Sequence, residues 1–161
     1  MLVSEKLNAK LNEQVTNELF ASQTYLAMSS MFKREGLHLL AGLFRKQAEE
    51  EREHALKILG YIEDRLGKVA LAAVPAPKGD YPSVLAALEA AVEHEKLVSR
   101  QIDALVELAE EEKDQATQAF LGWFVEEQIE EVHSMHKLAQ AAKMAGPALL
   151  QIEAYLIHIK G

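Results

Sequence analysis

Apolar residues recur every three or four positions along five stretches of the chain, which is the spacing of one face of an α-helix. The pattern breaks at Gly36, at Gly67 and at Gly146, which Pro147 follows, and these residue types often end helices. No strand-like alternation competes with it. The pattern therefore predicts an all-α protein, a single domain over residues 1–161, with helices over about residues 5–34, 37–66, 83–112, 114–145 and 148–160.

The connections between these helices predict their arrangement. Very short turns join the first helix to the second and the third to the fourth, so the members of each pair should be antiparallel neighbours. Residues 68–82 are the only long irregular segment and are rich in proline. Such a segment can run the length of the bundle, which would make the second and third helices parallel. Ser4, Ser83 and Asp114 are suited to cap the first, third and fourth helices. We expect a four-helix bundle with one long crossover loop and a short fifth C-terminal helix.

Apolar residues surround most of the axis of the fifth helix: Leu149, Leu150, Ile152, Tyr155, Leu156, Ile157 and Ile159. A helix that is apolar all round has to be buried, and this one is too short to join the bundle as an equal. We therefore expect it to be buried between subunits. The alternative is that it folds back onto its own bundle.

Glutamates interrupt the apolar stripes of the four long helices, which run from Leu7 to Phe32, Leu40 to Leu66, Leu85 to Leu105 and Ala116 to Ala142. The interrupting residues are Glu18, Glu51, Glu95, and Glu127 with Glu131. Each lies within a few residues of the midpoint of its helix, which is one turn or less at about 1.5 Å per residue. Helices with aligned ends share their midpoints, so these carboxylates should meet at one level inside the bundle.

A cluster of buried carboxylates needs positive charge, because an unpaired one costs several kcal/mol and like charges nearby add to that cost. No Lys or Arg lies on the four stripes. His54 follows Glu51 by three residues, so both side chains leave one face of the helix and can bind one metal ion. Two divalent cations would balance the remaining charge, and oxygen ligands with one nitrogen suit Fe(II), Mn(II) or Zn(II).

The composition also favours cations as partners. The 161 residues carry 17 Lys and Arg against 25 Asp and Glu, a net charge of −8, which disfavours nucleic acid and anionic membranes. The absence of cysteine excludes disulfides, iron–sulfur clusters and thiolate metal sites. No apolar run is long enough to span a membrane, and no signal peptide is visible, so we expect a cytoplasmic protein.

Four stretches of the sequence resemble the bacterial and archaeal non-haem ferritins: Asn17 to Leu19 with Tyr25, Ala48 to Ala55, His94 to Lys96, and Trp123 to Glu131. The resemblance covers essentially the whole chain. It implies that Glu18, Glu51 and His54 surround one iron. It implies that Glu51, Glu95 and Glu131 surround a second iron, with Gln128 close by. It also implies a catalytic-site tyrosine at Tyr25 and a third, weaker iron position near Glu50, Glu127 and Glu130.

The resemblance further implies an activity and an assembly. Ferritins of this kind are ferroxidases, which oxidise Fe(II) to Fe(III) with O₂ at a paired iron site within each subunit and store the product as a ferric oxide mineral. The mineral fills a hollow 24-subunit shell. We therefore expect iron storage and detoxification by a homo-oligomeric cage, with Fe(II) and O₂ as substrates and a di-iron site in each subunit. Haem is not expected, because Arg52 stands where haem-carrying relatives have methionine.

Several of these residues have alternative explanations. Glu130 and His133 repeat the Glu-x-x-His spacing, so a shifted fourth helix would make them ligands. His133 points about 200° away from Glu131 around the helix, which argues against that shift. His94, His133 and His136 are expected to face solvent. Glu50 and Glu130 could be ordinary solvated charges, Gln128 a surface residue and Tyr25 a core aromatic residue.

Three other classes of protein fit less well. A di-iron peroxidase of the rubrerythrin kind usually carries an added iron module held by cysteines, and this chain has none. A starvation-type DNA-protecting cage has its metal site between subunits, whereas one chain here supplies a full set of ligands. A structural or partner-binding bundle without metal leaves the core glutamates unexplained.

Overall fold

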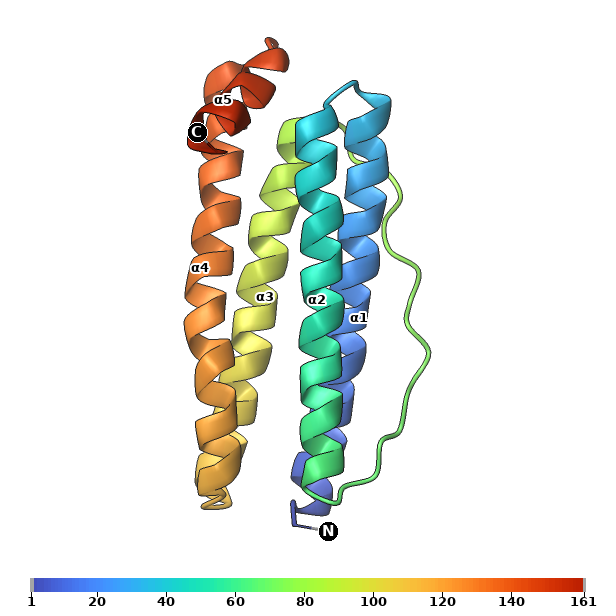
Figure 1. The fold of residues 1–161 in the computed structure, drawn as a ribbon, viewed down its shortest axis with the longest axis vertical. Helices are drawn as coiled ribbons and strands as arrows, with labels where there is room; N and C mark the ends of the chain where they lie inside the picture. The colour runs from blue at the N-terminus through green and yellow to red at the C-terminus, as the bar shows by residue number, and fades with distance from the viewer. Residues whose placement is uncertain (1, 161) are drawn as a thin grey trace.

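The structure is a computed structural model that describes residues 2–160, and within this range the chain forms five helices and no β-strand. Helices α1 (Glu5–Arg34), α2 (His38–Asp64), α3 (Val84–Glu111) and α4 (Gln115–Ala145) are long, and α5 (Leu150–Lys160) is short. Figure 1 shows the long helices side by side as a bundle, with α5 folded across one end. The predicted fold class is confirmed, although several helices are one or two residues shorter at their ends than expected. No helix of the described chain is both long and apolar enough to cross a lipid bilayer.

The segment between α2 and α3 runs along the outside of the bundle beside α1, from one end to the other (Figure 1). As predicted, α2 and α3 are therefore parallel, and the short turns make α1 and α2, and α3 and α4, antiparallel. Asn12 of α1 fastens the start of this loop. Its Nδ2 donates a hydrogen bond to the Lys68 carbonyl over 2.9 Å, and its Oδ1 accepts one from the Ala70 amide over 2.6 Å. The loop thus sets which ends of the two helix pairs are aligned.

Side-chain caps begin three of the long helices where the sequence predicts them. Ser4, Ser83 and Asp114 each accept a hydrogen bond, 3.0 Å long, from the backbone N–H three residues later. The α2 N-terminus has no cap from its own N-cap residue, because this residue is Leu37, whose side chain cannot accept a hydrogen bond. Its cap comes from α5 instead, where the Glu153 carboxylate accepts hydrogen bonds from the first free N–H groups of α2, 2.8 and 3.0 Å long.

One face of α5 packs on the end of the bundle. Ile152 and Leu156 are buried against α2 and α4, on either side of the Glu153 cap. Leu150 and Ile157 lie on the other face and are 73% and 63% exposed in the single chain. The alternative in which α5 folds back onto its own bundle is therefore correct for one face. Burial of the other face between subunits stays a prediction.

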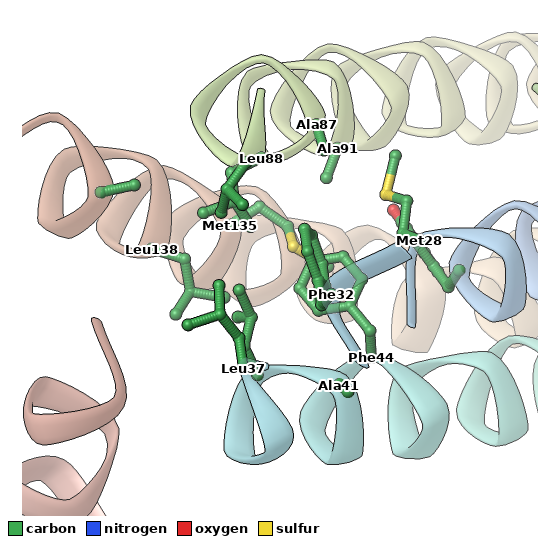
Figure 2. Close-up of a cluster of buried hydrophobic side chains, with 14 of the residues drawn as sticks. Met28, Phe32, Leu37, Ala41, Phe44, Ala87, Leu88, Ala91, Met135 and Leu138 are labelled. Carbon is green, nitrogen blue, oxygen red and sulfur yellow. The ribbon is translucent and has the colours of Figure 1, made fainter. Parts of the chain in front are cut away.

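The core consists of two separate groups of apolar side chains. Figure 2 shows the group near the turn between α1 and α2, where Phe32 and Phe44 meet edge to face with ring centroids 4.9 Å apart. The second group, around Ile58 and Ile102, fills the opposite half of the bundle. The predicted stripes are buried except near some helix ends. Leu66 is 68% exposed because α2 has already ended, in a left-handed turn with φ 55° at this residue.

The stripe of α4 differs from the predicted one in the first half of the helix, whereas the predicted positions from Glu131 to Ala142 are buried as expected. Ala116, predicted as the first core position, is exposed, and Thr117 and Leu121 are buried instead. In the same half, Gln128 lies in the core and Glu127 at its margin. Polar residues other than the predicted glutamates therefore also lie in the core of this helix, namely Thr117 and Gln128.

Candidate metal centre

Each long helix contributes one buried glutamate at the level where the two apolar groups meet: Glu18, Glu51, Glu95 and Glu131. The first three are 0% exposed and Glu131 is 5% exposed. On α2, for example, Ala48 belongs to one apolar group and Ala55 to the other. Packing on both sides of this level holds the four carboxylates together and away from water.

The first set of possible ligands comes from α1 and α2. Glu18, Glu51 and His54 offer ligand atoms that all lie within 4.8 Å of one another. His54 Nδ1 is 3.2 Å from Glu51 Oε2 and 3.8 Å from Glu18 Oε2. The Glu18 Oε2 atom is buried and has no hydrogen-bond partner. A buried acceptor without a donor is costly, and a cation among these three atoms would satisfy it.

The second set shares Glu51 with the first and adds Glu95 of α3 and Glu131 of α4, again with ligand atoms within 4.8 Å. The Tyr25 hydroxyl donates a hydrogen bond to Glu95 Oε1, and Gln128 Nε2 donates one to Glu95 Oε2 over 3.0 Å. The structure thus assembles the two ligand sets that the ferritin resemblance implies. Glu51 is the residue common to both.

The fold makes these carboxylates hard to ionise without a cation. Burial, with added repulsion from Glu51, raises the pKa of Glu95 to about 7 and that of Glu131 to about 9. Burial also raises the pKa of Glu51 to about 7, with repulsion from Glu18 adding to the effect and the hydrogen bond with His54 opposing it. Cations bound here would remove the cost of holding several negative charges together.

His54 is the only basic side chain among the buried polar residues of the described chain. Burial lowers its pKa, but the hydrogen bond with Glu51 and the nearby carboxylates of Glu18 and Glu51 outweigh that effect and raise the pKa to about 11. One imidazolium faces four carboxylates, so the metal-free centre lacks positive charge. A mixed set of carboxylates with one imidazole and no thiolate suits iron, manganese or zinc.

Two glutamines that the sequence analysis did not single out also hold the centre. Gln14 Nε2 donates to Glu18 Oε1 over 3.1 Å, and Gln47 Nε2 donates to Glu51 Oε1 over 2.9 Å. Each glutamine precedes its glutamate by four residues, one turn of the same helix. In the sequence, that spacing is the one feature that indicates the contact. Glutamine is usually a surface residue, so the spacing alone does not predict that these two side chains are buried.

Tyr25 lies fully inside the bundle, in contact with Glu95 as described, and burial with the negative charge of Glu95 raises its pKa well above the usual value. The His94 ring packs edge-on against the Tyr25 ring, with centroids 5.7 Å apart, and its Nε2 is buried. Burial lowers the pKa of His94. The expectation that His94 faces solvent is therefore wrong, because α3 turns it toward the aromatic side chains of α1.

The residues expected at a third position lie beside the paired centre. Glu50, Glu127 and Glu130 line a cleft of about 290 Å³ between α2 and α4. They do not form one tight ligand group within the described chain, and Glu127 instead joins His54 and Glu131 in a third set within 4.8 Å. The cleft places the three acidic side chains next to the centre rather than inside it.

The shifted arrangement of α4 is excluded. Glu131 is buried, whereas Glu130 and His133 are exposed, and His136 is exposed as expected. The helix therefore presents Glu131 to the centre and keeps the second Glu-x-x-His pair on its surface.

Comparison with known proteins settles the family. The family model for the ferritin-like domain matches residues 8–145. The chain belongs to the ferritin family. Bacterial non-heme ferritin of Bacteroides fragilis (strain 638R) is 40% identical over 147 residues, which are 91% of this chain and 92% of that protein. Bacterial non-heme ferritin of Staphylococcus aureus (strain USA300) is 40% identical over 130 residues, covering 81% of this chain and 78% of that protein.

Solved ferritin structures have the same fold over nearly the whole length of both chains. A structure described as an open pore ferritin from the hyperthermophilic archaeon Archaeoglobus fulgidus superimposes with a TM-score of 0.93 at 39% identity, covering 96% of each chain. A humanized archaeal ferritin superimposes with a TM-score of 0.94 at 35% identity, covering 97% of this chain and 94% of that one. The predicted resemblance to bacterial and archaeal non-haem ferritins is confirmed.

Proposed function

We propose that this ferritin stores iron by oxidising Fe(II) with O₂ at the paired centre and keeping the ferric product as an oxide mineral inside a hollow shell. Family membership supports the general role, iron storage. One observation carries the ferroxidase step, namely that two buried ligand sets share Glu51. A shared carboxylate holds two irons close enough to give up electrons to one O₂ molecule.

The proposed residue roles follow from the two sets. Glu18, Glu51 and His54 bind one Fe(II), and Glu51, Glu95 and Glu131 bind the other. O₂ accepts one electron from each Fe(II), so two Fe(III) form for each O₂ reduced by two electrons. The anionic ligands favour the higher charge of Fe(III) over Fe(II), because attraction to a carboxylate grows with the charge of the ion.

Side chains that contact the proposed ligands, without belonging to either ligand set, hold these ligands in position. Tyr25 and Gln128 each donate a hydrogen bond to one oxygen of Glu95, which fixes the plane of that carboxylate. Because its hydroxyl is hydrogen-bonded to a ligand of the second set, Tyr25 would also be close enough to donate a proton to the reduced O₂. The aromatic ring of Phe124 and that of Trp123 pack against His54, with centroids 6.0 and 5.4 Å away, and keep its imidazole in place.

Glu50, Glu127 and Glu130 would bind iron transiently in the cleft next to the centre, as the proposed third position. The mineral requires an enclosed volume, which one bundle lacks. We propose a 24-subunit shell in which the exposed face of α5, with Leu150 and Ile157, is covered by neighbouring subunits.

The first test is stopped-flow absorbance of aerobic Fe(II) oxidation by metal-free protein. We expect a fast phase that saturates at about two irons per chain. Glu95→Gln should remove this phase. Glu93→Gln changes an exposed glutamate two residues earlier on the same helix and should keep it. Oxidation no faster than in buffer would refute the ferroxidase proposal. Sedimentation velocity of the same sample measures the assembly, and a species much smaller than a 24-mer would refute the shell.

A further inference from the structure

Gln47 joins the centre to the cleft between α2 and α4. It lies one turn before Glu51 and is half-buried. Its single Nε2 group donates to Glu51 Oε1 over 2.9 Å and to Glu131 Oε2 over 2.7 Å. One amide therefore ties together two carboxylates from facing helices, both of which belong to the second ligand set.

The Gln47 amide lies between the cleft and the paired centre. The cleft of about 290 Å³ is lined by Gln47 and Glu131 together with the acidic residues Glu50, Glu127 and Glu130, but not by Glu51 or the other buried ligands. Gln47 and Glu131 thus face both the cleft and the second ligand set, while Glu127 connects the cleft to His54. In the described chain no Cα atom of α2 lies within 8 Å of one of α4, so side chains alone fill the space between these helices.

We propose that the Gln47 amide is a gate for divalent cations moving between the α2–α4 cleft and the paired centre. The inference rests on the proposed function, in which iron passes through that centre. The amide donates to Glu51 Oε1 and Glu131 Oε2 and so lies between the cleft and the centre. Each of these oxygens keeps a lone pair for a cation, but a cation that passes in either direction has to displace the amide.

The chemistry of an amide suits this task better than that of the other side chains of this size. Turning the amide over about its last bond replaces its N–H donors with a carbonyl oxygen, which is a ligand for hard cations. A glutamate in this place would add another negative charge and bind the cation in the cleft. A lysine would repel it. An amide is neutral and can either donate or accept a hydrogen bond. It can therefore separate the carboxylates from the cleft when it donates to them, and let a cation pass when it turns over.

A gate and a ligand have different effects on binding. Removing a gate speeds uptake and release of the cation by the same factor and leaves the dissociation constant unchanged. Removing a ligand or a support weakens the dissociation constant, mainly through faster release. The two rates and their ratio therefore distinguish a gate from a support.

The probe is Co(II), mixed anaerobically with metal-free protein in a stopped-flow instrument and later removed by excess EDTA. Fluorescence of Trp123, the single tryptophan, reports binding, because its ring centroid is 5.4 Å from that of His54. We expect Gln47→Leu to raise both rate constants about ten-fold, since opening the gate breaks two hydrogen bonds that this variant cannot make. Gln47→Met, which keeps the length of the side chain without its donors, should give the same result and guards against collapse of the cleft.

Two comparison variants sharpen the test. Gln14→Leu removes the equivalent amide from Glu18, but Gln14 does not line the cleft, so uptake from the cleft should not be faster. Gln23→Leu changes an exposed glutamine of α1 and should leave both rates as in the unchanged protein. Wild-type rates in both Gln47 variants, or a weaker dissociation constant with unchanged uptake, would overturn the gate.

The gate and the ferroxidase proposal fail separately. If Co(II) rates rise together in the Gln47 variants but the unchanged protein does not oxidise Fe(II) rapidly, the gate stands and the activity is refuted. If Fe(II) is oxidised rapidly and the Co(II) rates do not change, the activity stands and the gate is refuted.

Discussion

The two ligand sets of the centre balance their charge in different ways. In the first set, His54 lies 3.2 Å from Glu51 and 3.8 Å from Glu18, and its raised pKa of about 11 makes it a built-in cation. In the second set, Glu95 and Glu131 accept hydrogen bonds from neutral donors, and burial raises the pKa values of these carboxyls to about 7 and about 9. A cation bound to the first set replaces a proton on imidazole, whereas one bound to the second replaces protons on carboxyl groups.

This difference would make the two proposed metal positions inequivalent. Glu51 couples them, because it is the only ligand present in both sets. A change at Glu51 should therefore affect both positions, and changes elsewhere should affect one position more than the other. Metal affinity should depend on pH at both, because the ligands must lose their protons before they bind.

The largest effect is expected for Glu51→Gln. Loss of the shared carboxylate should disable both positions and slow rapid Fe(II) oxidation by more than about 100-fold. Removing a residue that only supports a ligand costs up to about 100-fold, so removing a ligand itself should cost more. Stopped-flow oxidation measures this rate. Glu53→Gln, an exposed glutamate of the same helix, is the matched control. A Glu51→Gln protein that keeps half the fast phase would show that the positions are independent.

The next effect separates the two sets. His54→Ala should weaken the first position and Glu131→Gln the second, each by about 100-fold, so that each variant keeps one tight Co(II) position of the pair. Isothermal titration of metal-free protein with Co(II) counts the tight positions. The comparison between the sets breaks down if either variant loses both positions, since only Glu51 is shared.

The stability of the metal-free protein should fall as the pH rises from 5 to 9. Glu51, Glu95 and Glu131 have pKa values of about 7 to 9 in the fold, above about 4.3 in the unfolded chain. The fold therefore binds more protons, and the stability held below the unfolded pKa is lost as the pH passes through the folded values. The raised pKa of His54 acts in the same direction above its unfolded value.

We expect Tm of the metal-free protein to fall by about 10 °C over this range, measured by scanning calorimetry. Saturating Zn(II) should remove most of this fall, because the bound ions keep the carboxylates ionised in the fold. A metal-free Tm that rises with pH over the same range would contradict the assigned pKa shifts.

The smallest effect is expected for Tyr25→Phe, which removes one hydrogen bond to Glu95. It should weaken the second position by about ten-fold and leave the first unchanged, as loss of an orienting partner does. Co(II) titration resolves the two positions. Tyr61→Phe is the matched control, since the Tyr61 hydroxyl bonds Thr117 at 2.9 Å in the other half of the bundle. Equal effects of Tyr25→Phe on both positions would argue against a contact specific to the second set.

Much of the centre could be predicted because its ligands replace apolar residues at core positions. Glu18, Glu51 and Glu95 interrupt clear helical stripes, and the spacing of His54 places it on the face of Glu51. On α4 the prediction admitted both Glu127 and Glu131. Apolar residues such as Trp123 and Val125 lie on several faces of this helix, so its own pattern does not define one core direction, and the neighbouring helices decide which glutamate is buried.

Polar residues inside the bundle were harder to predict. Gln14, Gln47 and His94 have types that usually face solvent, and only their neighbours make burial favourable. Gln47 finds a partner on its own helix in Glu51, which spacing can indicate, but also one on α4 in Glu131, which spacing cannot. The role of these ligands and neighbours in iron chemistry stays a prediction until the variants are measured.

The sequence by itself determined the helices, their caps and the carboxylates on their core faces, because these depend on residues within a few positions of one another. Only the tertiary structure decided which side chains from different helices meet. The crossover loop held by Asn12 and the apolar groups on either side of the glutamates set the relative heights and rotations of the helices. These long-range contacts place Glu131 rather than Glu127 against Glu51 and Glu95, since no local pattern fixes the rotation of one helix against another.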